Sequence, residues 1–303
     1  MPNTLTTATT PMMARSRRRW SHPYFVLLAV AIAATSAIAW RESRPSVLVG
    51  RTWPAAERVA IGDVSHQAWD ELLRRYVDGD GLVNYAGWKQ SAEDMRRLDE
   101  YLAALSRGDE TRDGTTEQRL AFWINAYNAV SVRGILREYP TTSIQNHVSR
   151  VWGYNFWRDL KLIVGDRRYS LGEIEHAVLR PMNEPRIHFA IVCASRGCPR
   201  LLNEAYSAER LEEQLNRNTL AFFADPTKCS VDAAQNELHL SPILDWFAAD
   251  FGASTPAVLQ RIADWLPESA QAVAQSKDVR VKYLDYDWSL NDQATAGPPL
   301  PPF

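Results

Sequence analysis

One helix restricts the possible folds of this chain more than any other segment. Thr115 and Gln118 form a T-x-x-Q capping box, and the sequence then runs through LAFWINAYNAVSVRGIL to Pro140. Apolar residues cover nearly every face of this segment, which is not the pattern of a helix with one side in water. We predict a buried central helix from Thr115 to about Tyr139, against which the other elements pack.

Two asparagines interrupt this apolar helix. Asn125 and Asn128 are three positions apart and therefore lie on one helix face. Asparagine is unfavourable inside helices, and a buried amide must find hydrogen-bond partners. Two interpretations remain open: the amides tie the helix to neighbouring backbone, or they are polar groups that face a cleft and support a site.

The remaining pattern predicts a single α+β domain, rich in helix. Helical spacings and short β-rich runs follow one another without the regular βαβ alternation of a doubly wound sheet. Hairpins at 160–169 and 228–240 predict a small, mostly antiparallel sheet, and by analogy the order is compatible with a papain-like arrangement. Further helices are expected at 64–76, 88–105, 170–180, 207–223, 241–252 and 256–274, and a strand at 279–284.

The first 40 residues have the pattern of a targeting segment. Four arginines between positions 15 and 19 precede an uncharged apolar run at 24–40, and 37–39 resembles an A-x-A cleavage site. This order is typical of a Sec-type signal peptide or of an uncleaved transmembrane anchor. We therefore expect the protein to be secreted, periplasmic or otherwise extracytoplasmic, with membrane contact only through this segment.

Proline-containing segments bound the predicted domain. Residues 41–61 include Pro45 and Pro54, show no clear period, and are expected to be a linker. Residues 292–303 form a Pro-rich tail. The domain itself is predicted to span 62–291.

Charge argues against nucleic acid as a partner. The net charge is −2, and leaving out residues 1–40, which hold four Arg and no acids, leaves 30 basic against 36 acidic residues, or −6. Such a body presents no positive surface to a polyanion. The sequence has no glycine-rich phosphate loop and no HExxH motif, so we predict no cofactor. The substrate or protein partner is not identified by any pattern.

The stretch RIHFAIVCASRGCPRL, residues 186–201, is the candidate site. It begins with β-forming residues and is expected to start as a strand at 187–192 that ends in a turn at 194–197. Cys193 and Cys198 flank this turn. Loops held by a rigid scaffold are common places for reactive groups.

Five residues are candidate catalytic groups: Cys198, Cys193, His176, Glu175 and His188. A thiol nucleophile needs a base or cation and a third group that orients the base. In a strand His188 and Cys193 face opposite sides, so we prefer His176 as the base. Glu175 is expected to face a different loop. Cys198, between Gly and Pro, is expected to be the more exposed sulfur, and Cys193 the more buried.

Three alternatives to a thiol enzyme remain open. Two Cys and two His are the ligands of a Cys₂His₂ zinc site, although their spacing fits poorly. In an oxidising compartment Cys193 and Cys198 can form a structural or redox-active disulfide. The third is a non-catalytic binding or scaffold module, in which an aromatic group lines a groove for peptide or glycan or simply belongs to the core. That group is Trp152, Tyr154, Phe156 and Trp157.

Five separated blocks carry a family resemblance. They are LAFWINAYNAV (120–130), SLGEIEHAVLR (170–180), EPRIHFAIVCASRGCPRL (184–201), LSPILDWFAADFG (240–252) and YLDYDWSLN (283–291). In this order they resemble the DUF547 family, a domain of unknown function, over roughly 62–291. Arg200 departs from the second proline that many members have. The resemblance implies an often secreted or anchored bacterial protein and no established activity. The residues themselves are compatible with a cysteine-dependent hydrolase or acyl transferase, of the peptidase, amidase or transglutaminase kind.

Overall fold

The computed structural model describes residues 46–149 and 153–295. The chain divides into two units, 1–44 and 45–303, and the description concerns the second. The predicted signal or anchor at 1–40, Trp152, and the last part of the Pro-rich tail therefore lie outside the described residues. Among the helices that are described, none is both long and apolar enough to cross a membrane.

The predicted central helix is present as α5 (Thr116–Glu138). Thr115 and Gln118 form the expected capping box, in which each side chain accepts the backbone N–H of the other residue. Most α5 side chains are buried, which confirms the prediction of a helix enclosed on nearly all sides. Gly134 lies where the helix meets Phe156, because a Cβ at this position would stand 2.6 Å from the phenyl ring.

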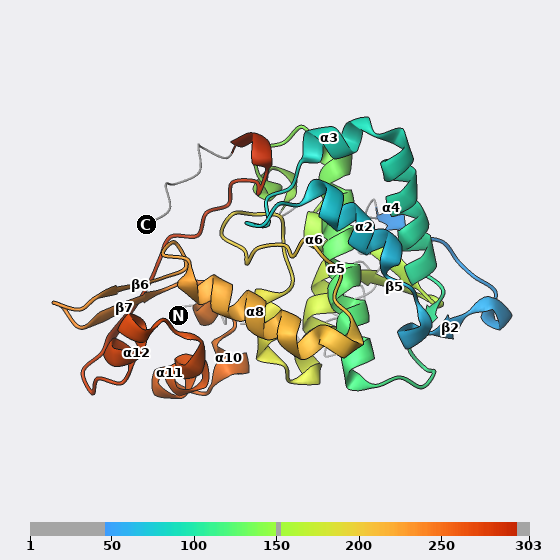
Figure 1. The fold of residues 1–303 in the computed structure, drawn as a ribbon. Helices are drawn as coiled ribbons and strands as arrows, with labels where there is room; N and C mark the ends of the chain where they lie inside the picture. The colour runs from blue at the N-terminus through green and yellow to red at the C-terminus, as the bar shows by residue number, and fades with distance from the viewer. Residues whose placement is uncertain (1–45, 150–152, 296–303) are drawn as a thin grey trace, which may run out of the picture. The chain divides into compact units, whose positions relative to one another are not determined.

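Shorter helices surround α5, and α3 and α4 pack directly on it (Figure 1). The predicted helices at 88–105 and 256–274 are each divided in the structure. Ser91 ends the first piece and caps the next through a hydrogen bond to the Asp94 N–H. The helices are α2 (Gln67–Tyr76), α3 (Tyr85–Gln90), α4 (Ala92–Leu105), α6 (Phe156–Asp159), α7 (Leu171–Glu173), α8 (Leu211–Ala224), α9 (Ile243–Trp246), α10 (Ala248–Phe251), α11 (Thr255–Ile262) and α12 (Glu268–Ala274).

Both predicted hairpins are present, and parallel strands extend them. The strands are β1 (Val47–Val49), β2 (Val59–Ala60), β3 (Gly108–Asp109), β4 (Leu160–Val164), β5 (Arg167–Ser170), β6 (Cys229–Asp232), β7 (Glu237–Leu240) and β8 (Arg280–Tyr283). β4 pairs antiparallel with β5 and β6 with β7, whereas β1 joins β4, β8 joins β7, and β2 joins β3 in parallel. The two three-stranded sheets are therefore mixed and the β2–β3 pair is parallel, within the α+β architecture that the sequence predicted.

Three boundary predictions are corrected. The part of the linker that the structure describes, 46–61, contains β1 and β2, which pair with β4 and β3. The expected tail begins too early, since Asp292 is buried and a 3₁₀-helix, η9 (Gln293–Thr295), follows. The expected strand at 187–192 is instead a 3₁₀-helix, η6 (Pro185–Phe189), followed by irregular chain. Pro185 occupies its first turn, where its fixed φ and missing N–H are tolerated.

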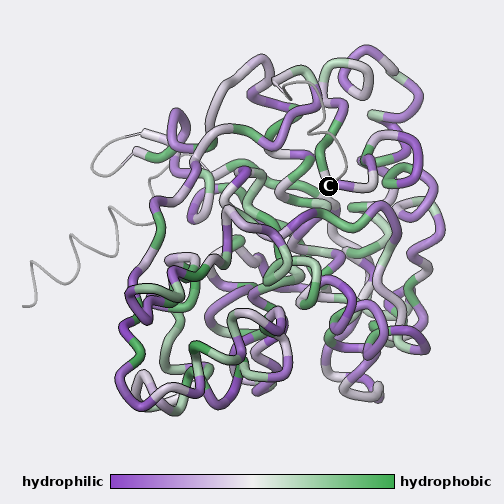
Figure 2. Tube along the Cα trace, turned by 60° about the vertical axis from the view of Figure 1, so that its left-hand side comes forward, coloured by the Kyte–Doolittle hydropathy of each residue, from purple (hydrophilic) through white to green (hydrophobic). Residues whose placement is uncertain are grey.

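Two hydrophobic clusters lie within the described residues. The larger surrounds α5, and the smaller joins Phe189, α8 and the β6–β7–β8 sheet. In Figure 2 the hydrophobic trace runs mainly through the interior, while outer turns and loops are hydrophilic. Phe156 belongs to the larger cluster and Trp157 packs against it, so these members of the predicted aromatic group contribute to the core.

The loop at 78–81 packs against the chain that follows the thiol turn. Gly81 has φ +80°, and a Cβ there would stand 2.5 Å from the Arg200 Cβ and 2.6 Å from the Leu201 nitrogen. Gly79, two residues earlier, has no atom within 4 Å of an added Cβ. The backbone conformation and the close neighbours therefore require glycine at position 81 but not at position 79.

We predict that Gly81→Ala lowers the free energy of unfolding by about 1–3 kcal/mol, because it combines left-handed backbone strain with a backbone clash. Gly79→Ala is the matched control and should change stability by no more than about 0.5 kcal/mol. Urea unfolding measures both. Equal stabilities for the two variants would contradict the close approach of this loop to Arg200 and Leu201.

Candidate functional site

The thiol segment is held by a side-chain amide of α5. Asn128 donates to the Ala190 carbonyl at 3.0 Å and accepts the Val192 N–H at 2.9 Å. Asn125, one turn earlier, donates to the Tyr206 carbonyl at 2.8 Å and accepts its N–H at 2.9 Å. Each amide therefore supplies hydrogen bonds to buried backbone groups that have no neighbouring strand to pair with. The first interpretation, amides that tie the helix to backbone, is the one the structure supports.

The turn that follows is fixed by the C-terminal segment. Ala194 has φ +65°, a left-handed conformation that is costly for a residue with a Cβ. Its carbonyl accepts the Asn291 N–H at 3.1 Å, and the Gly197 N–H donates to the Asp287 carbonyl at 2.7 Å. Gly197 also lies flat against Tyr286, since a Cβ there would stand 2.7 Å from the ring. The ring can approach the turn only because position 197 has no side chain.

The two thiols form one cluster with Ser195 and Tyr286. The Cys198 sulfur accepts the Cys193 N–H at 3.1 Å and the Tyr286 hydroxyl at 3.1 Å, and the Ser195 hydroxyl lies 3.4 Å away. The Cys193 sulfur lies 3.3 Å from the Ser195 hydroxyl and 3.6 Å from that of Tyr286. Of the two sulfurs, Cys198 alone receives a backbone N–H from the described residues, so it is the better place for negative charge. Both cysteines are free thiols in the structure.

This arrangement separates the acidities of the two thiols. Burial alone would raise the pKa of Cys198, but hydrogen bonds from Cys193, Ser195 and Tyr286 lower it to about 6. The pKa of Cys193 is raised well above its ordinary value by its hydrogen bond to Cys198 and by burial. Cys198 is therefore the thiolate at neutral pH, and Cys193 remains a thiol that donates to it.

Cys198 lines a large cavity. The cavity has a volume of about 940 Å³, within the range of ligand clefts, and its wall includes Ser195, Cys198 and Tyr286. Cys198 is only 6% exposed, so the sulfur is reached through this cavity. The relative exposure of the cysteines is the reverse of our prediction, because Cys193 is half-buried and Cys198 is buried. The donors that hold the Cys198 sulfur also cover it.

Glu175 is the predicted acid whose pKa is affected by the charge of Cys198. It lies in a π-helix, η4 (Ile174–Leu179), where the Arg180 N–H bonds to the Glu175 carbonyl five residues back. π-Helical turns are rare in proteins, and those that occur are often found at functional sites. The Glu175 carboxylate accepts from the Tyr127 hydroxyl at 3.4 Å. Burial, and then the charge of nearby Cys198, raise the pKa of Glu175 to about 7. The hydrogen-bond partner of Glu175 is thus a residue of the central helix, whereas a different loop was expected.

The two histidines have other partners. His176 is exposed, and its Nδ1 lies 3.2 Å from an Arg180 nitrogen. His188 is buried, and its Nε2 lies 2.7 Å from the Asp250 carboxylate, which Arg180 also binds. Burial lowers the pKa of both histidines. Among the interactions of the described residues, neither imidazole bonds to a cysteine, so the structure does not bring the preferred base to the thiols.

Three contributors to the site were not predicted as functional residues. Ser195 was assigned only to the turn, Tyr127 only to the helix, and Tyr286 only to a family block. The cluster combines residues of α5, the thiol turn and the C-terminal segment. These segments are far apart in the sequence, so no short sequence motif predicts it. Within the described residues no group of three or more His, Cys, Asp or Glu side chains is arranged to hold a metal ion, so the zinc alternative has no geometric support.

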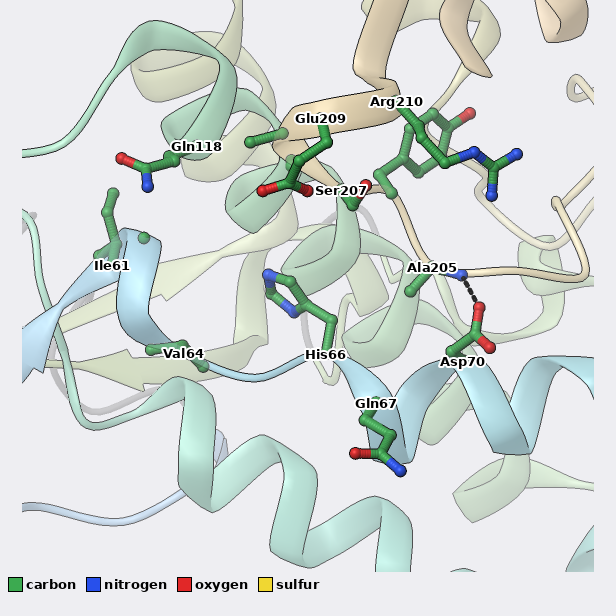
Figure 3. A pocket seen from close by; sticks show the side chains of 14 residues that line it. Ile61, Val64, His66, Gln67, Asp70, Gln118, Ala205, Ser207, Glu209 and Arg210 are labelled. Atoms are coloured by element: carbon green, nitrogen blue, oxygen red, sulfur yellow. Dashed lines mark hydrogen bonds between the residues drawn. The ribbon is translucent and has the colours of Figure 1, made fainter. Parts of the chain in front are cut away.

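A second cavity of about 380 Å³ contains none of the thiol-cluster residues. The His66 ring points into it, and Asp70 on its rim accepts the Ala205 N–H (Figure 3). The His66 Nδ1 lies 2.7 Å from the Tyr101 hydroxyl, and burial lowers the pKa of this histidine to about 4. His66 is therefore uncharged at neutral pH.

Comparison with known proteins supports the family resemblance over part of the chain. A family model described as "Protein of unknown function, DUF547" matches residues 111–223. The matched region contains α5, η4 and both thiols of the cluster, whereas Tyr286 lies beyond it. No curated protein and no solved structure matches the chain. The description of the family assigns no activity.

We predict that Asn128→Ala lowers the free energy of unfolding by roughly 2–4 kcal/mol, because it leaves the buried Ala190 carbonyl and Val192 N–H without partners. The control, Asn146→Ala, removes an exposed amide and should cost no more than about 0.5 kcal/mol. Urea unfolding gives the stabilities, and hydrogen exchange at the Val192 amide should accelerate selectively. An unchanged Val192 exchange rate would show that Asn128 does not hold this segment.

We predict that one thiolate appears as pH rises through about 6, because the donors around Cys198 stabilise its charge. The ultraviolet absorbance of the thiolate measures this step. Tyr286→Phe removes one donor and should move the midpoint to higher pH, whereas Tyr283→Phe, at an exposed ring with no thiol contact, should not. Cys198→Ser should abolish the step, since burial raises the pKa of Cys229 to about 11. A first thiolate only in the alkaline range would contradict the assignment.

Proposed function

We propose that this protein is a cysteine-dependent hydrolase or acyl transferase with Cys198 as its nucleophile. One observation carries the proposal: the sulfur that accepts three donors is also the sulfur that lines the large cavity. A thiolate stabilised at neutral pH and reached through a substrate-sized cleft has the two properties a thiol nucleophile needs. Cys229 has neither, since it is buried in the smaller hydrophobic cluster.

The reaction follows from the thiolate. The Cys198 sulfur attacks the carbonyl carbon of an amide or ester, a C–S bond forms, and the bond to the amine or alcohol leaving group breaks. The leaving group takes a proton from an acid of the site. Water then attacks the thioester in a hydrolase, or an amine in an acyl transferase, and the thiolate is released. No oxidant or reductant is consumed.

Glu175 is the residue we propose to handle that proton. Its pKa of about 7 is close to the pKa of about 6 for Cys198, so both groups change protonation state near neutral pH, as an acid and a nucleophile of one reaction require. It replaces His176, which is exposed and bonded to Arg180. His188 is better explained as a structural group, because it is buried, bonds to Asp250 and stacks on Phe247 at 4.1 Å.

A redox dithiol is the second candidate function. Its support is that Cys193 and Cys198 are hydrogen-bonded to each other and share Ser195 and Tyr286 as hydrogen-bond partners. In an oxidised form the two sulfurs would form a disulfide that leaves no nucleophile. Cys193 separates the two functions, since a hydrolase needs one thiol and a redox dithiol needs both.

We also propose that the protein works outside the cytoplasm, either secreted or held by an N-terminal anchor. The support is the basic cluster at 15–19 followed by the apolar run at 24–40. Such a compartment favours disulfides, so the redox state of the two thiols is part of the functional question.

We predict that p-nitrophenyl acetate acylates the reduced protein at Cys198, giving a burst of nitrophenolate and an acyl adduct visible by mass spectrometry. Cys198→Ser should abolish both, and Glu175→Gln should slow turnover by roughly 10²–10⁴-fold. Cys229→Ser is the matched control and should retain the burst.

Cys193→Ser decides between the two candidates. It should keep the acyl adduct, because the Cys193 backbone N–H remains as a donor. Adduct formation by the Cys198→Ser protein would contradict the acyl-transfer proposal. Disulfide exchange with a dithiol substrate that is lost in both single Cys→Ser variants would favour the redox function.

A further inference from the structure

An aromatic ledge stands beside the thiols. We define it as Trp246, Tyr286 and Trp288, whose ring centroids are 4.9 Å apart for Trp246–Tyr286, 4.4 Å for Tyr286–Trp288 and 5.8 Å for Trp246–Trp288. Trp246 is 49% exposed, which is unusual for so large an apolar side chain. The ledge combines α9 with the C-terminal segment, and it is not the aromatic group that the sequence suggested.

The ledge is continuous with the site. Tyr286 belongs to both, because its ring contacts the two tryptophans and its hydroxyl donates to the Cys198 sulfur at 3.1 Å. Tyr286 also lines the 940 Å³ cavity, together with its neighbours Asp285 and Asp287. A group that rests on the ledge is therefore next to the cavity wall that holds the thiolate.

The charge around the ledge is negative. Asp245 precedes Trp246, and Asp285 and Asp287 flank Tyr286; all three are exposed. Over the described parts of the chain none of these carboxylates forms an ion pair. Three cations also line the cavity, and each has a partner of its own: Lys228 donates to the Arg196 carbonyl at 2.7 Å, Arg196 to the Asp292 carbonyl, and Arg200 to the Asn218 side chain. Asp287 accepts hydrogen bonds from Ser289, but all three carboxylates lack an ion pair, and their charge beside the exposed Trp246 favours a cation.

We propose that the ledge and its carboxylates bind a cationic side chain, Lys or Arg, of a peptide substrate. This rests on the proposed function, because it names the substrate class of the same site. A ring face attracts a cation through its quadrupole, and the neighbouring carboxylates add to that attraction. A neutral glycan would also stack on the rings, but it would gain nothing from the charges. The charge pattern therefore favours the basic peptide.

The experiment measures binding without chemistry. In the full-length Cys198→Ser protein, the probe is a blocked Gly-Gly-Lys-Gly-Gly peptide, and its control is the same peptide with norleucine in place of lysine. Isothermal titration and the NMR shifts of the tryptophan indole N–H groups report binding. We expect the lysine peptide to bind more tightly, to shift the indole signals of the ledge, and to weaken as salt rises.

Matched variants locate the binding. Trp246→Leu should weaken the lysine peptide by about 2- to 5-fold, the range of an exposed cation–π contact. Asp245→Asn with Asp285→Asn should weaken it further and remove most of its salt dependence. Asp113→Asn neutralises an exposed carboxylate elsewhere in the chain and should change nothing. Thermal unfolding of each variant verifies that the fold is intact.

The outcomes separate this inference from the proposed function. Equal binding of the lysine and norleucine peptides, or a neutral oligosaccharide binding the ledge in place of the lysine peptide, would overturn the inference. Thiol-dependent acylation by the wild-type protein would then still stand. If the lysine peptide binds as described but no acyl adduct forms at Cys198, the ledge is a basic-peptide site and the catalytic proposal fails.

Discussion

The fold depends on two side-chain amides of α5, those of Asn125 and Asn128, which hydrogen-bond to buried backbone that has no regular secondary structure. A buried loop without strand pairing would leave N–H and C=O groups unsatisfied, at a cost of about 1–3 kcal/mol each. Asn128 satisfies Ala190 and Val192, and Asn125 satisfies Tyr206. Without this support the chain before Cys193 would have to pair in a sheet or reach solvent. The same interaction thus makes the fold possible and places the thiols.

The thiol turn gains its chemistry from segments distant in sequence. Tyr286 approaches the turn from the C-terminal segment, over Gly197, and donates to Cys198. Glu175, in η4, accepts a hydrogen bond from Tyr127 of the central helix. The left-handed Ala194 is the local cost of this geometry, and the Asn291 N–H that its carbonyl accepts helps to hold it. Strain that is over-determined by surrounding contacts is a recurrent property of functional sites.

Local signals predicted much of the fold, and their limits are physical. The capping box at Thr115 identified the start of the central helix, because the pattern is complete within four residues. The prediction of a strand at 187–192 was wrong. A strand needs a neighbouring strand to hydrogen-bond its backbone groups, whereas here the Asn128 side-chain amide provides such bonds. The parity argument concerning His188 lost its premise with that strand. The choice of His176 over Glu175 also required knowing which side of η4 is buried, because Glu175 is buried and its neighbour His176 is exposed.

The two cysteines show why residue types alone could not assign the site. The sequence distinguished Cys193 from Cys198 only by expected exposure, with Cys198 the more exposed, and the structure reverses that order. Their difference arises from the hydrogen bonds that each sulfur receives: Cys198 accepts the Cys193 N–H and the hydroxyl groups of Ser195 and Tyr286, and within the described residues no backbone N–H donates to the Cys193 sulfur. That asymmetry gives Cys198 the negative charge and Cys193 the proton. A pair arranged in this way is one thiol–thiolate unit, in which the donor that lowers the pKa of the nucleophile is also the partner with which it can be oxidised.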